Sequence, residues 1–392
     1  MVRTPQQFKE MQDIEVKTEH RVTKIDPQEK KVEVVNLSKS ETQWFPYDKL
    51  IVATGARSRR LNIFGSHAKN IFTLKDLQDG IRIKNYVDEK RPKRVAILGA
   101  GYISLEMCEA FRLRGLETFV FYRRELPAGN LEREISERIL EELQENGVHF
   151  LPSHEPVAFQ LNSNGEVSSL ETTEGSYPID TVFMALGVIP NVEIAKEAGV
   201  ELGKTGAIKT DLSQRTNLTD IFTAGDCCEV FNLVSQDWTY TPLGDIANKQ
   251  GRVAGDNAAG RRAVFSGVVG SAAFKVFELE VAFTGLGMEA AQKYGFDVDS
   301  QVIEAESKVG YMPGAKRLII KLIFERKSGR LLGAQMVGKE GIARRINALA
   351  VALHQKMAID EIARLDFAYA PPFSGTLDPI LIAAEQAAKK IK

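Results

Sequence analysis

A glycine turn between a predicted strand and a predicted helix carries the strongest chemical signal in this chain. Gly99 and Gly101 follow the apolar run 95–98, and we expect a helix over 103–114. Gly99 permits a tight turn, and Gly101 lets the backbone approach a pyrophosphate that the first helical N–H groups can bind. Ser104 replaces the third glycine of such a motif with another small residue. We therefore predict a dinucleotide site here, rather than an ordinary turn of an α/β sheet.

The end of the next predicted strand, 118–122, indicates which dinucleotide is bound. A carboxylate at this place would bind the ribose hydroxyls of NAD. This strand instead ends at Tyr122, and Arg123 and Arg124 follow it. Two guanidinium groups suit a 2′-phosphate, although a solvated turn is the alternative. We expect NADPH to be the cofactor, with NADH less favoured.

Composition agrees with an enzyme of two or three domains. The chain has 392 residues and a net charge of −1, so no strong field points to nucleic acid or to an acidic membrane surface. No apolar run approaches the ~18 residues of a membrane span, and the N-terminus does not resemble a secretory signal. Three cysteines make no disulfide framework, which favours the cytoplasm, and the five histidines show no metal-binding spacing.

The elements that must position these residues form four blocks. The first holds short strands, and the second is the strand–helix–strand unit around the glycine turn, with a helix over 131–146. The third contains an apolar strand that leads into Ala224, Gly225 and Asp226. The last has strands at 273–277, 317–325 and 330–337, followed by an apolar-striped helix over 341–356.

The chain resembles the flavoprotein pyridine nucleotide–disulfide oxidoreductases, in particular the coenzyme A-disulfide reductase and NADH oxidase branch. Six motifs in family order carry the resemblance: 53–55, 99–106, 224–226, 310–315, 337–341 and 369–374. It implies an α/β protein whose incomplete FAD-binding domain is interrupted by a Rossmann-type NAD(P) domain and followed by a C-terminal α+β dimerisation domain. The expected ranges are 1–92 and 213–268 for FAD, 93–212 for NAD(P) and 269–392 for dimerisation.

The same resemblance assigns cofactor-binding residues. Asp226, after Gly225, would hold the FAD ribityl chain, although it could simply cap the next helix. That helix begins near Leu243 to Ala247, and its N-terminus would face the flavin pyrimidine. Tyr102 would lie over the nicotinamide pocket and Glu106 would reach the nicotinamide amide. The remaining residues assigned to cofactor binding are Ala53, Thr54, Gly55 and Gly187.

The implied reaction passes hydride from NADPH to FAD, and then electrons to a cysteine and to a disulfide of coenzyme A type. Tyr311 and Tyr369 would reach the cysteine site of the partner subunit in a homodimer. A phenol there can protonate a departing thiolate, whereas packing at an interface is the simpler role.

Two family features are missing from the sequence, namely the first Gly-x-Gly motif for FAD and the redox cysteine. Cys108, Cys227 and Cys228 do not replace that cysteine, and we expect Cys108 to lie in the core. The resemblance thus predicts an N-terminally truncated, inactive reductase. Two alternatives remain, an NADH oxidase or peroxidase and a flavin-free, nucleotide-binding dimer remnant.

Overall fold

The computed structural model describes residues 3–391, so residues 1, 2 and 392 of the predicted first and last domains lie outside it. The described chain forms two compact units. The first comprises the chain up to Ala56, Pro190–Phe231 and Asp237–Gly267, and the second comprises Arg57–Ile189, Asn232–Gln236 and the chain from Val268 onward. These divisions differ from the predicted boundaries near 92 and 212, and the domain assignment stays a prediction.

The first unit combines a small antiparallel sheet with a parallel strand pair. Strands β1 (His20–Asp26), β2 (Lys31–Asn36) and β3 (Glu41–Pro46) form the antiparallel sheet, after helix α1 (Pro5–Gln12). Strand β15 (Ile221–Thr223) pairs in parallel with β4 (Leu50–Val52), and this unit also holds α5 (Glu193–Glu197) and α6 (Gly244–Ala258). Phe222 and Ala224 pack against Ala254 of α6, which fixes that helix beside the end of β15.

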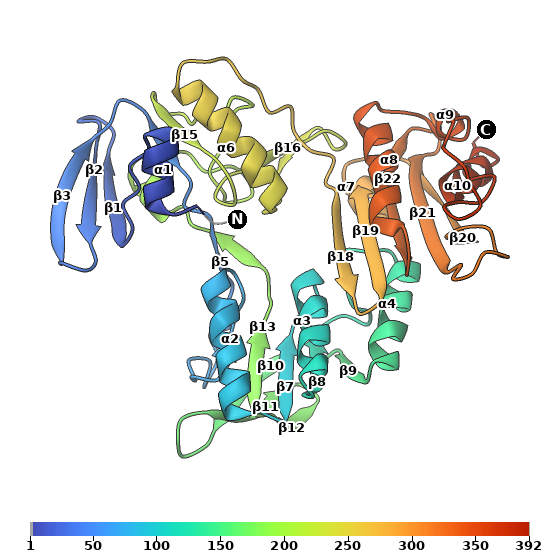
Figure 1. The fold of residues 1–392 in the computed structure, drawn as a ribbon, viewed down its shortest axis with the longest axis horizontal. Coiled ribbons are helices and arrows are strands. Elements are labelled where there is room, and N and C mark those ends of the chain that lie inside the picture. The colour runs from blue at the N-terminus through green and yellow to red at the C-terminus, as the bar shows by residue number, and fades with distance from the viewer. Residues whose placement is uncertain (1–2, 392) are drawn as a thin grey trace. The chain divides into compact units, whose positions relative to one another are not determined.

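The second unit begins with a five-stranded parallel sheet of order β6-β13-β7-β8-β9. Its strands are β6 (Ile71–Phe72), β7 (Arg94–Leu98), β8 (Glu117–Tyr122), β9 (Val148–Pro152) and β13 (Thr181–Met184). The connecting helices are α2 (Leu77–Lys90), α3 (Tyr102–Leu113) and α4 (Arg133–Glu145). Figure 1 shows α2 and α3 beside this sheet, which is the strand–helix–strand frame that the glycine motif requires.

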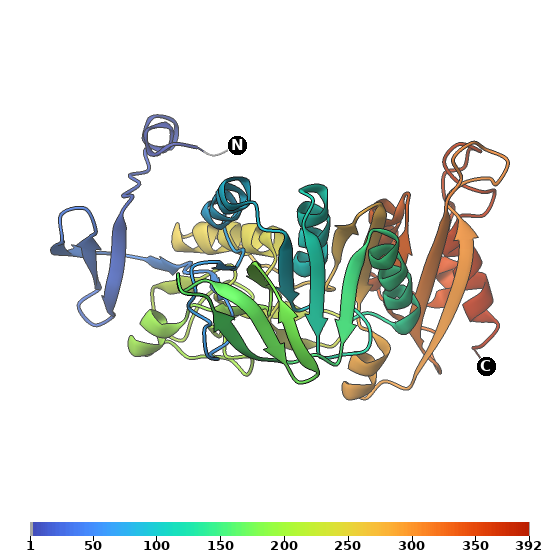
Figure 2. The same ribbon diagram turned by 90° about the horizontal axis from the view of Figure 1, so that it is seen from below.

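The two faces of the parallel sheet are covered differently. Val95, Ile97 and Val120 share one core with residues of α2, α3 and α4. On the opposite face, Ala96 and Leu98 pack with the antiparallel strands β10 (Pro156–Leu161) and β11 (Val167–Thr172), which continue into β12 (Gly175–Pro178). Figure 2 shows these green strands and the teal helices on opposite sides of the sheet. Burial of both faces explains the continuous apolar run at 95–98.

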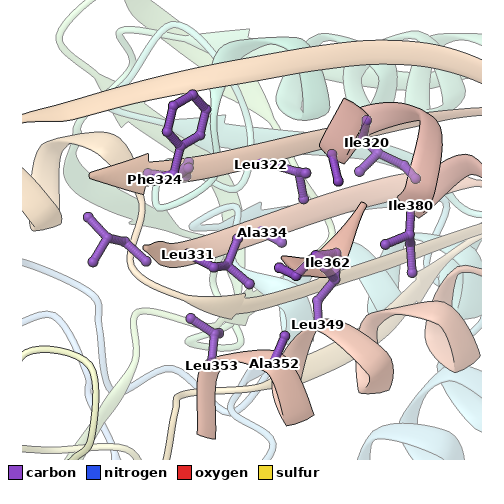
Figure 3. Packing of buried hydrophobic residues seen from close by; sticks show 14 of the residues in the cluster. Ile320, Leu322, Phe324, Leu331, Ala334, Leu349, Ala352, Leu353, Ile362 and Ile380 are labelled. Carbon is purple, nitrogen blue, oxygen red and sulfur yellow. The ribbon is translucent and has the colours of Figure 1, made fainter. Parts of the chain in front are cut away.

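The C-terminal half of the second unit is an antiparallel sheet of order β18-β19-β22-β21-β20. Its strands are β18 (Ala272–Val276), β19 (Leu279–Gly285), β20 (Val298–Glu306), β21 (Arg317–Glu325) and β22 (Leu331–Gly338). The helices are α7 (Met288–Lys293), α8 (Ile342–His354), α9 (Ile359–Ile362) and α10 (Pro379–Ala388). Ile320, Leu322 and Leu349 are among the side chains that join the sheet to α8, α9 and α10 (Figure 3). Val281 and Val337 instead share a core with α4.

Four short strands lie at the divisions between the units: β5 (Ala56–Ser58), β14 (Val188–Pro190), β16 (Val230–Asn232) and β17 (Asp237–Thr239). Among the described residues, no helix is both long enough and apolar enough to cross a membrane.

Candidate functional site

The glycine turn has the geometry that the sequence predicts. Gly99 adopts φ of +100°, and a Cβ at this position would lie 2.5 Å from the carbonyl oxygen of Ala185. A side chain is therefore excluded by both backbone conformation and space. Gly101 is the N-cap residue of α3 and supplies no side-chain cap, while a Cβ at Gly101 would meet no heavy atom within 4 Å. The first N–H groups of α3 are thus left for an anion.

A cavity of about 660 Å³ opens in front of this turn. Its lining includes Gly99 and Gly101 from the turn and Tyr122, Arg123 and Arg124 from the end of β8. The structure therefore brings together the residues predicted to bind the pyrophosphate and the 2′-phosphate. The other lining residues that bear on our predictions are Arg59, Gly129, Asn130, His154 and Gly187.

The two arginines at the end of β8 differ in their contacts. Arg124 donates from its guanidinium to the carbonyl oxygen of Gly129, and a Cβ at Gly129 would collide with that side chain at 2.7 Å. Gly129 thus provides the space that Arg124 occupies. Arg123 is exposed, and no side-chain hydrogen bond or ion pair of Arg123 is found within residues 3–391. Its guanidinium is available to an anion.

Three other predicted residues of the motif lie outside the lining of the cavity. Ser104 is fully buried, and its hydroxyl has no hydrogen-bond partner among the described residues. Tyr102 is 41% exposed, with its ring centroid 6.3 Å from that of Phe274. Burial of its carboxylate, together with the nearby Glu109 charge, raises the pKa of Glu106. The roles of Tyr102 and Glu106 at the nicotinamide stay predictions.

His154 lines the cavity, although the sequence did not single it out as a site residue. Its Nε2 lies 2.7 Å from the hydroxyl oxygen of Tyr177, and its Nδ1 lies 2.7 Å from the carbonyl oxygen of Pro152. Both ring nitrogens are therefore engaged, which fixes the orientation of the ring in the cavity wall.

Among the described residues, no group of His, Cys, Asp and Glu is placed to hold a metal ion.

The residues predicted to bind FAD gather at the carboxyl ends of β4 and β15 in the first unit. Thr54 donates from Oγ1 to the carbonyl oxygen of Asn191 at 2.6 Å, and Asn191 Nδ2 donates back to the Thr54 carbonyl at 2.9 Å. This pair holds the segment Ala53 to Gly55 in place. Gly225 adopts φ of +82°, and a Cβ there would lie 3.5 Å from the Cβ of Ala247.

Helix α6 has Leu243 at its N-cap and no side-chain cap, so its first N–H groups are left for an electron-rich partner. Asp226 follows Gly225 directly, and its backbone carbonyl accepts a hydrogen bond of 2.8 Å from the Tyr240 hydroxyl. A positive-φ glycine, an adjacent carboxylate and an uncapped helix N-terminus fit the donor and acceptor needs of a flavin.

Gln250 is a second residue that the sequence did not reveal. It is 1% exposed, its Oε1 accepts from the Gly225 N–H at 3.0 Å, and its Nε2 donates to the Glu229 carbonyl at 3.1 Å. One α6 side chain thus holds both ends of the turn that carries Asp226. A lone glutamine within a polar helix gives no sequence signal for such a role.

The variant Gln250→Met is expected to lower the thermal midpoint of the unit that contains α6 by about 5 °C. Two buried backbone groups would lose their partner, at about 1–3 kcal/mol each before relaxation. The matched variant Lys249→Met alters an exposed residue whose ion pair with Asp245 spans 3.4 Å, and it is expected to shift the midpoint by less than about 1 °C. Thermal denaturation of both variants checks this, and equal midpoints would contradict it.

The three cysteines are all buried. Cys108 and Cys227 are 0% exposed and Cys228 is 4% exposed, so the prediction of Cys108 as a core residue is confirmed. Burial raises the pKa of the Cys108 thiol, and the neighbouring Cys227 sulfur together with burial raises that of Cys228. The pKa of Cys227 is instead lowered to about 6, chiefly by its hydrogen bond with Cys228, but its sulfur is as buried as the other two and is not accessible to a substrate.

Comparison with known proteins agrees with this geometry. The model of the pyridine nucleotide-disulphide oxidoreductase family matches residues 3–250. The chain belongs to this family. The dimerisation domain model of the same family matches residues 271–379, which confirms the predicted α/β fold with a C-terminal dimerisation domain. Members of the family are FAD-dependent and use NAD(P)H.

Individual relatives cover nearly the whole chain. An NADH oxidase of Methanocaldococcus jannaschii is 34% identical over 100% of this chain and 86% of its own length. A coenzyme A disulfide reductase of Staphylococcus haemolyticus is 30% identical over 96% of this chain and 83% of its length. These comparisons do not support the predicted truncation.

Two solved structures are also similar. An NAD-dependent persulfide reductase from A. fulgidus has a TM-score of 0.95 at 37% identity and covers 99% of this chain and 72% of that chain. An engineered water-forming NADPH oxidase bound to NADPH has a TM-score of 0.90 at 25% identity and covers 95% of this chain and 82% of that chain.

Proposed function

We propose that this oxidoreductase takes hydride from NADPH, with FAD as its second cofactor, and reduces a disulfide of coenzyme A type. The observation that carries the NADPH preference is the end of β8. Tyr122 stands where a ribose-binding carboxylate would stand, and Arg123 and Arg124 line the same cavity as the glycine turn. A 2′-phosphate in this cavity would meet two cations at the strand end, while the acidic residue of the lining, Glu155, comes from the segment after β9.

The engineered NADPH oxidase supports this preference. Its substitutions include an aspartate changed to alanine and the next residue, an alanine, changed to arginine. Tyr122 and Arg123 form the same pattern in this chain, in which a non-acidic residue is followed directly by an arginine. A glycine of that enzyme is also changed to alanine, at the spacing that separates Ser104 from Tyr122 here. The persulfide reductase from A. fulgidus is NAD-dependent, so the family contains both preferences.

In this proposal the residues of this chain bind and orient the two cofactors. The first N–H groups of α3 would bind the pyrophosphate, and Arg123 would bind the 2′-phosphate. Asp226 and the N-terminus of α6 would hold FAD, which supplies an acceptor for hydride and a donor of single or paired electrons when it is bound. Glu106, with its raised pKa, would accept or donate a hydrogen bond at the nicotinamide amide.

The disulfide part of the proposal rests on relatives and on two exposed phenols. Tyr311 is 76% exposed and Tyr369 is 49% exposed, both within the dimerisation domain. Exposed phenols are available to a partner subunit, and we propose that a homodimer forms and that these tyrosines donate protons to a leaving thiolate. Relatives named coenzyme A disulfide reductase favour this substrate class.

An oxidase reaction is the second candidate, because all three cysteines of this chain are buried. Electron transfer to oxygen needs no protein thiol, whereas disulfide reduction in this family type proceeds through an accessible thiolate. The inactivity predicted for the disulfide step would leave this reaction as the measurable one. The NADH oxidase of Methanocaldococcus jannaschii supports this candidate.

The acceptor decides between the two. The disulfide proposal predicts that the FAD-reconstituted protein oxidises NADPH faster with coenzyme A disulfide in the absence of oxygen than with oxygen alone, whereas the inactivity expected from the missing redox cysteine predicts the reverse order. NADPH absorbance at 340 nm measures both rates. A rate of NADPH oxidation that depends on oxygen and does not change when the disulfide is added would contradict the disulfide proposal and support the oxidase proposal.

In a protein that carries the family's redox cysteine, the variant Tyr369→Phe is expected to slow disulfide-dependent turnover by about tenfold, because proton donation to a leaving group contributes on this scale. Reduction of bound FAD by NADPH, followed by stopped-flow absorbance, is expected to be unchanged. Tyr294→Phe removes a similarly exposed phenol (40%) and serves as the control. Equal loss in both half-reactions, or no loss in either, would reject the role of Tyr369.

A further inference from the structure

The segment that follows β8 carries the charge and shape of the proposed 2′-phosphate site. We call residues 123–131 the selecting loop. One part of this loop is fixed to the glycine turn, because the Ala128 N–H donates to the Ala100 carbonyl at 2.8 Å. Gly129 and Asn130 line the cavity together with Arg123 and Arg124. The position of the loop therefore decides where the two guanidinium groups lie.

Glu132 directly follows the selecting loop, and this residue is held by the C-terminal antiparallel sheet and its connections. The Glu132 N–H donates to Gln335 Oε1 at 2.7 Å. Glu132 Oε1 accepts from the Met288 N–H at 2.8 Å, and Glu132 Oε2 lies 2.9 Å from Lys321 Nζ. Every one of these partners lies in β21, in β22 or at the start of α7.

The arrangement is unusual for a residue at a helix start. Glu132 is the N-cap of α4, yet its carboxylate makes no cap bond with α4 and points to α7 and Lys321 instead. Gln335 and Lys321 are 4% and 7% exposed, so these contacts are shielded from water. Burial alone would lower the pKa of Lys321, but Glu132 and Glu134 outweigh it and raise that pKa.

The other end of α4 provides an internal comparison. Glu142 is 1% exposed, lies 2.8 Å from Arg138 and 3.7 Å from Lys339, and accepts from the Glu278 N–H at 3.3 Å. This second cluster also joins α4 to the C-terminal sheet, but it lies at the end of α4 far along the chain from the selecting loop. The effect of losing a contact between α4 and the C-terminal sheet can therefore be tested separately from the effect of moving the selecting loop.

We infer that the contacts of Gln335 and Lys321 with Glu132 hold the selecting loop in its nucleotide-binding position, so that a domain outside the nucleotide fold sets the affinity for the dinucleotide. Neither Gln335 nor Lys321 lines the cavity, so we regard both as positioning residues. The inference rests on the proposed binding of a dinucleotide in this cavity, and it adds to that proposal a role for the C-terminal sheet.

The test compares Gln335→Met, Lys321→Met and the control Lys339→Met by calorimetric titration with 2′-phospho-ADP-ribose and with ADP-ribose. Gln335→Met is expected to raise the Kd of the 2′-phosphorylated ligand about 3- to 10-fold, as is usual for residues that act through a neighbour. Lys321→Met is expected to do the same, and Lys339→Met to change it less than about twofold. Hydrogen exchange of amides 123–131 is expected to quicken only in the first two variants.

Each outcome decides the inference. Unchanged Kd and unchanged loop exchange in a folded Gln335→Met protein would overturn it, as would an equal loss of affinity in Lys339→Met. If the wild-type protein binds ADP-ribose no more weakly than its 2′-phosphorylated form, the NADPH preference fails, and the same comparison with ADP-ribose then decides the role of Gln335. A wild-type protein that binds neither ligand overturns both proposals.

Discussion

Replacing Arg123 and Arg124 together by alanine is expected to raise the Kd for NADPH about 100-fold, while the Kd for NADH changes less than about threefold. Both guanidinium groups line the cavity at the glycine turn, and each charge-assisted hydrogen bond to a phosphate contributes about 1.5–3 kcal/mol before losses to solvent. NADH lacks the 2′-phosphate and so loses no such bond. Titration of nucleotide fluorescence measures both constants.

The control for this variant is Arg317→Ala, which removes an exposed arginine at the start of β21. It is expected to leave both constants unchanged within about twofold. A parallel fall in affinity for NADH and NADPH would show that the two arginines act on the common part of the cofactor. An unchanged Kd for NADPH would place the 2′-phosphate elsewhere.

The variant Gly101→Ala is expected to weaken dinucleotide binding by about 10- to 100-fold without loss of stability. A Cβ at Gly101 meets no protein atom within 4 Å, so the fold tolerates it, but the methyl group would occupy the approach of the pyrophosphate. Calorimetric titration with ADP-ribose and thermal denaturation are the two measurements.

Gly99→Ala gives the opposite pattern and serves as its counterpart. Its methyl group would lie 2.5 Å from the Ala185 carbonyl oxygen, at a φ of +100°, so the protein itself must strain by about 1–3 kcal/mol or more. A lowered thermal midpoint is expected for Gly99→Ala alone. If Gly101→Ala bound ADP-ribose as tightly as the wild-type protein, the pyrophosphate would not lie at this turn.

The nucleotide-binding fold could be predicted from the sequence because the residues that indicate it are close together in the chain. The apolar run at 95–98 and the glycines at 99 and 101 predict a buried strand, a turn and a helix, and the structure has β7 and α3 at those places. The hairpin strand predicted at 317–325 matches β21 residue for residue. Periodicity and glycine chemistry act over a few residues, so one sequence can show them.

What the sequence did not show depends on contacts between distant segments. Gln335 and Lys321 lie in a strand pair that reads as an ordinary hairpin, and their partner Glu132 lies roughly two hundred residues away along the chain. His154 and Gln250 likewise acquire their roles only when distant strands and helices meet. Such pairs leave no local pattern of spacing. The antiparallel layer of β10, β11 and β12 was also missed, although short local turns join its strands.

The cytoplasmic location and the identity of the disulfide substrate remain predictions. Neither of them can be tested by the geometry of the cavity. The central claim is narrower: the cavity at the glycine turn selects a dinucleotide that carries a 2′-phosphate.

The most direct measurement is the ratio of the Kd values of the wild-type protein for ADP-ribose and for 2′-phospho-ADP-ribose, determined by calorimetric titration under identical salt. The arrangement of Tyr122, Arg123 and Arg124 predicts that the 2′-phosphorylated ligand binds at least about tenfold more tightly. Equal affinity, or tighter binding of ADP-ribose, would contradict the claim.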